Sequence, residues 1–121
     1  MLARDGNEHP VPSELHATFH DIAAAFAAGD YALSNHAVTG VRAVDLSIAK
    51  SIAESVSAYG VSLAPLHAAA WRHAVYRWMD GYWRVLVDLT TEREEVSDLT
   101  LHAKLHDTEP LTLEVESVHV P

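Results

Sequence analysis

The chain contains no cysteine, and its five glycines each stand alone. The lack of cysteine excludes disulfides, thiolate catalysis and cysteine-ligated zinc or iron–sulfur centres. Because the glycines are isolated, no G-x-G-x-x-G or Walker-type phosphate loop is present, and we expect no cofactor. The chain also lacks a G-x-S-x-G nucleophile elbow. With no complete catalytic motif, we predict that the protein is not an enzyme.

Long hydrophobic runs are missing as well. The longest stretch without a polar residue spans residues 22–28, whereas a membrane-spanning helix needs about 20 apolar residues. The first residues contain no apolar segment of the kind found in secretory signals. We therefore expect a cytoplasmic protein.

Basic residues are scarce, since 8 Lys and Arg oppose 17 Asp and Glu for a net charge of −9. Nucleic acids and anionic membranes are poor partners for such a chain, because phosphate binding needs clustered Lys and Arg. Residues 80–121 carry most of the excess acid, with ten acidic and three basic side chains. This distribution favours a basic protein partner.

Hydrophobic periodicity divides the chain into helices followed by strands. Residues 1–12 have no periodic pattern and are predicted to form a flexible N-terminal arm, with one domain over residues 13–121. Ser13 is the expected N-cap of a first helix that ends at Gly29, and a second helix is expected between Asp45 and Gly60. Apolar residues at helical spacing carry these predictions: Leu15, Phe19, Ile22 and Phe26 in the first, and Ile48, Ile52, Val56 and Tyr59 in the second.

After Gly60 the apolar period changes to two, which is typical of strands. The predicted strands are Val61–Leu66, Trp71–Trp78, Tyr82–Thr90, Val96–Leu105 and Leu111–Val120. Asp80-Gly81 indicates a tight hairpin. We predict an α+β fold in which the two N-terminal helices pack on one face of a four- to five-stranded antiparallel meander sheet. The same elements could also form a curved-sheet cone with the helices filling its mouth.

Two histidine pairs have a spacing of four residues, but neither predicts a metal site. His16 and His20 lie on the first helix without the glutamate of the H-E-x-x-H motif, and they flank the apolar stripe. His102 and His106 lie on a strand, where four residues span roughly 13 Å, too far for one ion. We interpret all four as solvated polar residues and predict no metal.

Acidic residues of the last three strands and their turns are the candidate docking site. If odd positions of the last two strands face the core, then Asp98, Glu114 and Glu116 lie on the outer face, joined by Asp88 if its strand keeps the same pleat. A tyrosine anchor is expected because this residue is enriched in binding hot spots. The predicted docking set is Asp88, Glu92, Glu94, Glu95, Asp98, Glu114 and Glu116, with Tyr82 as the anchor.

Several short runs resemble a family of small uncharacterised bacterial α+β domains. They are Ala28-Gly29-Asp30-Tyr31, the segment Trp83–Thr90, Ser97-Asp98-Leu99-Thr100-Leu101 and Val118-His119-Val120. Separately, the size, acidity, α+β layout and lack of cysteine resemble immunity proteins of bacterial contact-dependent growth inhibition systems. That resemblance implies binding to a cognate toxin domain, often a basic nuclease.

Our hypothesis is therefore a cytoplasmic immunity protein that occludes the active site or substrate groove of a basic toxin domain. Acidic side chains would imitate the phosphates that a nuclease groove holds. The alternative is a small cone-shaped hydrolase or isomerase, or a ligand-binding domain. It would use a pocket between helices and sheet lined by Tyr82, Trp83 and a buried carboxylate such as Asp88 or Asp98.

Overall fold

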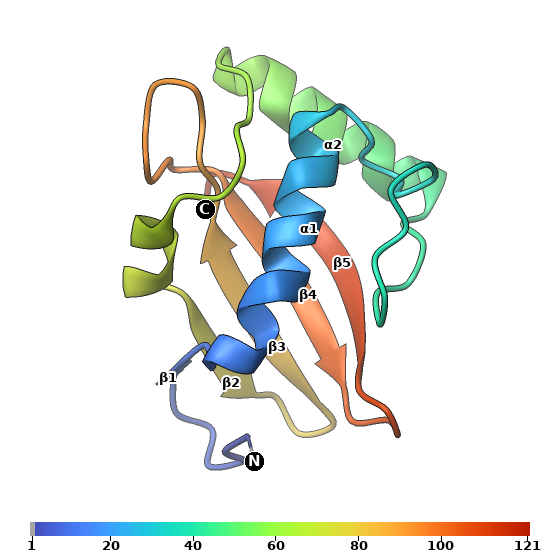
Figure 1. The fold of residues 1–121 in the computed structure, drawn as a ribbon. Helices are drawn as coiled ribbons and strands as arrows, with labels where there is room; N and C mark the ends of the chain where they lie inside the picture. The colour runs from blue at the N-terminus through green and yellow to red at the C-terminus, as the bar shows by residue number, and fades with distance from the viewer. Residues whose placement is uncertain (1) are drawn as a thin grey trace.

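The computed structural model describes residues 2–121, which form an α+β fold (Figure 1). The helices are α1 (His16–Ala27) and α2 (Leu46–Tyr59), and the 3-10 turns are η1 (Ser13–Leu15) and η2 (Ala68–Arg72). The strands are β1 (His9–Pro10), β2 (Val75–Trp78), β3 (Tyr82–Asp88), β4 (Thr100–His106) and β5 (Thr112–His119). The five strands pair antiparallel in chain order, which confirms the predicted meander.

Both predicted helices are present, and their apolar stripes are buried. Phe19 of α1 and Ile52 of α2 are almost completely inaccessible and belong to one hydrophobic core. Gly60 ends α2 in the left-handed conformation with φ 81°, as its position predicted. The predicted role of Ser13 is wrong, because this residue begins η1 and its hydroxyl donates to the carboxylate of Glu14.

Alternate residues of the sheet supply the other half of this core. Four residues of β3 and β4 are fully inaccessible to solvent: Val85, Val87, Leu101 and Ala103. The even-numbered residues of the two strands are partly exposed, except Thr100, which is buried at the start of β4. The strand with the densest apolar run, β3, is the central strand of the five. Because only one set of alternate positions joins the main core, the other face of the sheet is where polar side chains gather.

The predicted strand boundaries need correction in the middle of the chain. Residues 61–66 make only one isolated bridge, between Leu63 and Thr91, and residues 68–72 form η2 rather than the start of a strand. Ala64 donates its backbone N–H to the carbonyl of Thr90. Pro65 lacks an N–H and follows this contact directly, so the segment crosses the end of the sheet instead of extending it.

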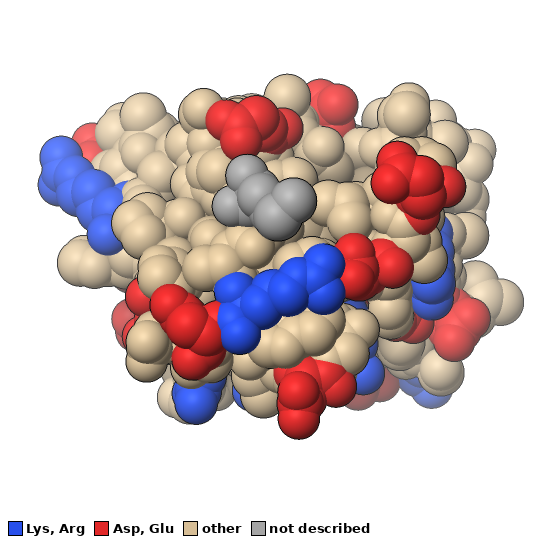
Figure 2. Space-filling model, turned by 90° about the horizontal axis from the view of Figure 1, so that it is seen from below, with Lys and Arg blue, Asp and Glu red and all other residues tan. Residues whose placement is uncertain are grey.

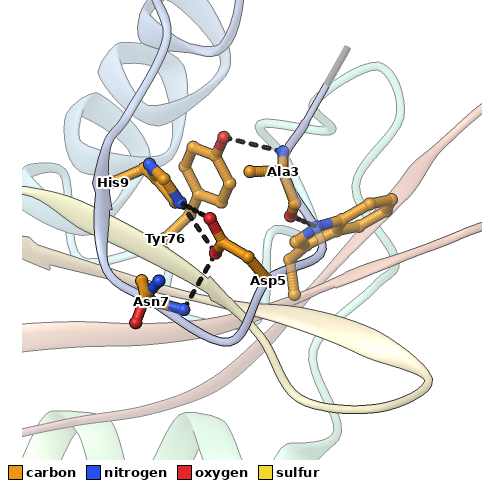
Figure 3. A network of polar contacts seen from close by, with 6 residues as sticks. Ala3, Asp5, Asn7, His9 and Tyr76 are labelled. Atoms are coloured by element: carbon orange, nitrogen blue, oxygen red, sulfur yellow. Dashed lines mark hydrogen bonds and ion pairs between the residues drawn. The ribbon is translucent and has the colours of Figure 1, made fainter.

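The N-terminal arm also differs from the prediction, because residues 9 and 10 form β1 beside β2. The backbone of Ala3 is held twice: its N–H donates to the hydroxyl of Tyr76 at 2.9 Å, and its carbonyl accepts from the indole of Trp83 at 2.9 Å. Figure 3 shows the Asp5 carboxylate directed at the His9 ring, 2.9 Å away. No local pattern reveals the contacts of Ala3, because Tyr76 and Trp83 lie far along the chain.

The opposite edge of the sheet is partly covered by the loop between the helices. Val41 forms a parallel bridge with Leu113 of β5. The N–H of Leu113 donates to the carbonyl of Gly40 at 2.8 Å, and the N–H of Arg42 donates to the carbonyl of Leu113 at 2.9 Å. The main chain of β5 is thereby hydrogen-bonded on both sides at this point.

Candidate interaction site

The predicted docking residues divide into two groups, and the first lies on the partly exposed face of the sheet. This open face is formed by the even-numbered residues of β3 and β4 and their neighbours. Asp88, Glu114 and Glu116 lie on this face. Tyr82 also lies on it, at the end of β3 opposite Asp88. A β-bulge between His102 and Ala103 shifts the register of β5, so Glu116 and Ser117 both lie on this side before Val118 returns to the core.

Basic side chains lie among the predicted acidic docking residues of the open face. Three basic residues on adjacent strands lie directly opposite one another and form a basic row: Arg77, Arg84 and Lys104. On β5, the residue opposite Lys104 is Glu114. The Nε atom of Arg84 is buried and has no hydrogen-bond partner among residues 2–121. Sequence parity placed the acids on this face but did not reveal the strand register that brings the cations beside them.

Two of the three predicted carboxylates on the open face, those of Glu114 and Glu116, are already paired with cations. The Glu114 carboxylate and the His106 ring are hydrogen-bonded at 2.9 Å, and this carboxylate lies 3.8 Å from the Arg42 guanidinium. Glu116 lies 3.6 Å from the ammonium of Lys104. These ion pairs are partly solvated, so each contributes little to stability, but they reduce the negative potential that a partner would meet.

The second group occupies the loop between β3 and β4, residues 89–99, which we call the acidic loop. It contains Glu92, Glu94, Glu95 and Asp98. The prediction that Asp98 lies on the outer face of a strand is wrong, because β4 begins only at Thr100. At the base of the loop, the N–H of Leu89 donates to the carbonyl of Leu99 at 2.8 Å.

Hydrogen bonds inside the acidic loop fix its shape. The hydroxyl of Ser97 donates to the carbonyl of Leu89 at 2.6 Å, and that of Thr90 donates to the carbonyl of Glu95 at 2.7 Å. Ser97 and Thr90 are both buried. The loop is therefore an ordered element with its own polar interior, although it contains no helix or strand.

Tyr59, the last residue of α2, fastens the acidic loop to the rest of the domain. Its hydroxyl donates to the Glu94 carboxylate at 2.6 Å and accepts from the N–H of Asp98 at 3.2 Å. The hydrogen bond to Glu94 raises the pKa of Tyr59. The spacing of apolar residues predicts Tyr59 only as part of a helical stripe. No local signal in the sequence pairs it with Glu94 and Asp98, which lie far along the chain.

Three acidic side chains of the loop remain directed to solvent: Glu92, Glu95 and Asp98 are exposed. Glu95 lies 3.7 Å from the ring of His67, an exposed and weak contact. Arg93 is the one Lys or Arg within residues 89–99. The acidic loop thus presents unneutralised negative charge on a rigid support, unlike the open face.

The members of the two histidine pairs contact other side chains. His16 stacks on Trp71 with ring centroids 3.7 Å apart, and His20 meets the same ring edge-on. His102 stacks on His119 at 4.2 Å, and its pKa is lowered by burial and by His119. Within residues 2–121, no group of three or more His, Asp or Glu side chains is placed to hold a metal ion.

The pocket predicted for the alternative function is assembled differently. Trp83 is buried on the core side of β3, whereas Tyr82 lies on the open face, so they do not line one pocket. Asp88 accepts a hydrogen bond from Thr100 on the open face, and Asp98 is exposed. Neither carboxylate lies in a buried pocket between the helices and the sheet, where the alternative function would place it.

Comparison with known proteins gives a family but no activity. The helices described in residues 2–121 are too short or too polar to cross a membrane. No curated protein and no solved structure matches the chain. Residues 23–121, from the middle of α1 to the last residue, match the family described as a domain of unknown function, DUF7668, and the chain therefore belongs to that family.

Proposed function

We propose that this protein binds a basic protein partner through the acidic loop. The observation that carries the proposal is the contrast between the two acidic groups. Glu92, Glu95 and Asp98 are exposed on an ordered loop, whereas Glu114 and Glu116 are paired with cations on the open face. Uncompensated charge on a rigid support favours electrostatic recognition, because a complementary partner gains attraction without ordering the loop.

The attachment through Tyr59 supports this role. A flexible acidic loop would lose conformational freedom on binding, at a cost of about 0.5–1.5 kcal/mol for each side chain that becomes immobilised. Because Tyr59 already fixes both the Glu94 carboxylate and the backbone at Asp98, part of that cost is met in the free protein. The net charge of −9 adds long-range attraction for a basic domain.

We place this binding in a bacterial toxin–immunity system, on the resemblance described above. In that setting the partner is a basic toxin domain, such as a nuclease, and the protein acts in the cytoplasm by covering its active site or substrate groove. The exposed carboxylates take positions that nucleic-acid phosphates would otherwise occupy. The protein itself has no catalytic role in this proposal.

Co-expression with the basic domain of a toxin encoded in the neighbouring reading frame tests the proposal. Wild-type protein should protect cells, and the double variant Glu92→Lys/Glu95→Lys should weaken both protection and the association rate at low salt. The matched control is Asp21→Lys/Glu54→Lys, which makes the same change in charge at exposed helical positions.

The outcomes separate the surface from the function. If the loop variant folds and protects as well as wild type, the acidic loop is not the docking site. If Glu114→Lys/Glu116→Lys alone abolishes protection, the open face is the docking site instead. If wild-type protein protects against no neighbouring toxin, the immunity role is refuted.

A further inference from the structure

A groove of about 560 Å³ lies at the end of the molecule opposite the acidic loop. Trp83, at the start of β3, lies in its wall, whereas the acidic loop follows the end of the same strand. Figure 1 shows this separation, with the loop at the top and the N-terminal arm at the bottom. The volume is within the range of small-molecule sites, about 300–1,000 Å³.

The groove is walled mainly by apolar and aromatic surface. The arm and η1 contribute Leu2, Pro10, Pro12 and Leu15, and the sheet and the β4–β5 turn contribute Tyr76, Trp83 and Leu111. Leu111 is 39% exposed and is one of three large apolar residues among residues 2–121 that are classed as exposed. A ligand in this groove therefore needs an apolar body.

The polar edges of the two aromatic side chains are already used by the arm. The Tyr76 hydroxyl and the Trp83 indole N–H are both bonded to the backbone of Ala3. Both aromatic side chains are themselves buried, with Trp83 2% and Tyr76 7% exposed, so the accessible apolar surface of the groove comes mainly from the aliphatic side chains around them.

The charge at the rim favours a cation. Glu14 and Asp107 contribute two carboxylates, and Arg4 contributes one positive charge. Arg4 is occupied, since its guanidinium lies 2.8 Å from Asp107 and within 5 Å of the Trp78 and Trp83 ring centroids. Within residues 2–121, the Glu14 carboxylate contacts only the neighbouring Ser13 hydroxyl.

Arg4 shows which chemistry this end of the molecule stabilises. Its guanidinium lies over two adjacent indole rings, 4.7 Å and 4.9 Å from their centroids, and pairs with the Asp107 carboxylate. Figure 2 shows this end from below, where basic and acidic side chains adjoin a broad uncharged surface. Glu14 contributes a second carboxylate to the groove lining, and no ion pair to it is found within residues 2–121.

We propose that the groove binds a small organic cation with an apolar body, such as an arylalkyl amine or guanidine. The apolar part packs on Pro12, Leu15 and Leu111, and the cationic group pairs with the carboxylate of Glu14. This binding function is separate from the proposed docking function, because the two surfaces lie at opposite ends of β3.

The test uses 2-phenylethylamine as the probe and 3-phenylpropionate as its anion of matched shape, each titrated against the full chain by ¹H–¹⁵N NMR. We expect the amine to shift the Trp83 indole signal saturably, with a dissociation constant of about 1 mM, corresponding to about −4 kcal/mol. Glu14→Gln should weaken amine binding by about 2- to 5-fold, as for a solvated ion pair. Glu8→Gln, an exposed arm residue outside the groove, should leave it unchanged.

A second pair of variants does not depend on Glu14. Leu111→Lys places a cation in the groove and should abolish amine binding, whereas Leu46→Lys changes an 80% exposed leucine on α2 and should have no effect. The proposal is overturned if the propionate binds as tightly as the amine. It is also overturned if amine shifts stay linear with concentration, or if folded Leu111→Lys protein binds the amine normally.

Discussion

The basic row on the open face predicts that one charge reversal stabilises the protein. Arg84 has Arg77 directly opposite on β2 and Lys104 directly opposite on β4. Like charges at such positions are destabilising, by roughly the 0.2–1 kcal/mol that opposite charges contribute. Arg84→Glu converts two repulsive pairs into two attractive ones, and it also removes the buried Nε that has no partner within residues 2–121.

The expected size follows from these pairs and from what the shorter side chain loses. Two relieved repulsions and two new attractions give about 0.8–4 kcal/mol in total. The aliphatic stem of Arg84 packs on the sheet, and its loss offsets part of this gain. We expect a net increase of about 0.5–2 kcal/mol in the free energy of unfolding, and a smaller increase for Arg84→Gln.

Urea denaturation followed by circular dichroism, at low and at high salt, measures this change. The gain should shrink with added salt, because the screening length falls from about 30 Å at 0.01 M to about 3 Å at 1 M. Arg72→Glu, an exposed position without an ion pair among the described residues, is the control and should change stability by less than about 0.5 kcal/mol. A folded Arg84→Glu protein that is no more stable than wild type at low salt would refute the argument.

Three further predictions rest on individual side-chain and backbone contacts. Tyr59→Phe removes the hydroxyl that holds the acidic loop and should cost about 1–3 kcal/mol, with faster hydrogen exchange at residues 92–98. Hydrogen bonds from His36 and from the loop backbone lower the pKa of Asp30 from 3.8 to about 2, so its contribution to stability is present above pH 4 and is lost as the pH falls toward 2. Acid titration of unfolding should show this loss in wild type and not in Asp30→Asn. Deletion of residues 2–6 removes a backbone partner of Trp83 and should shift tryptophan emission to longer wavelength.

The elements that sequence analysis located are those specified by local patterns. The stripe through Phe19, the left-handed Gly60 and the Asp80-Gly81 turn each determine structure within a few residues. The N–H of Met79 donates to the carbonyl of Tyr82 at 2.8 Å, which closes the predicted hairpin. Features that depend on distant partners were not accessible in this way, and β1 is the clearest case.

The candidate site shows the same division. Alternation was sufficient to place Glu114 on the outer side of β5, because side-chain direction in a strand is a local property. It could not show that Arg42 and His106 neutralise this carboxylate, since that depends on strand register and on a loop packed against the sheet edge. The role of Tyr59 was missed for the same reason.

The two edges of the sheet, β1 and β5, limit how another chain can bind to this protein. At one edge β1 is only two residues long and includes Pro10, which has no N–H to offer a further strand. At the other edge the main chain of Leu113 is already bonded to Gly40 and Arg42. Strand addition, the usual route to edge-to-edge aggregation and to β-augmentation by peptides, is therefore obstructed at both places. Where strand addition is obstructed, a partner must use the loops, the grooves and the side chains of the open face, where charge and shape can discriminate between one ligand and another.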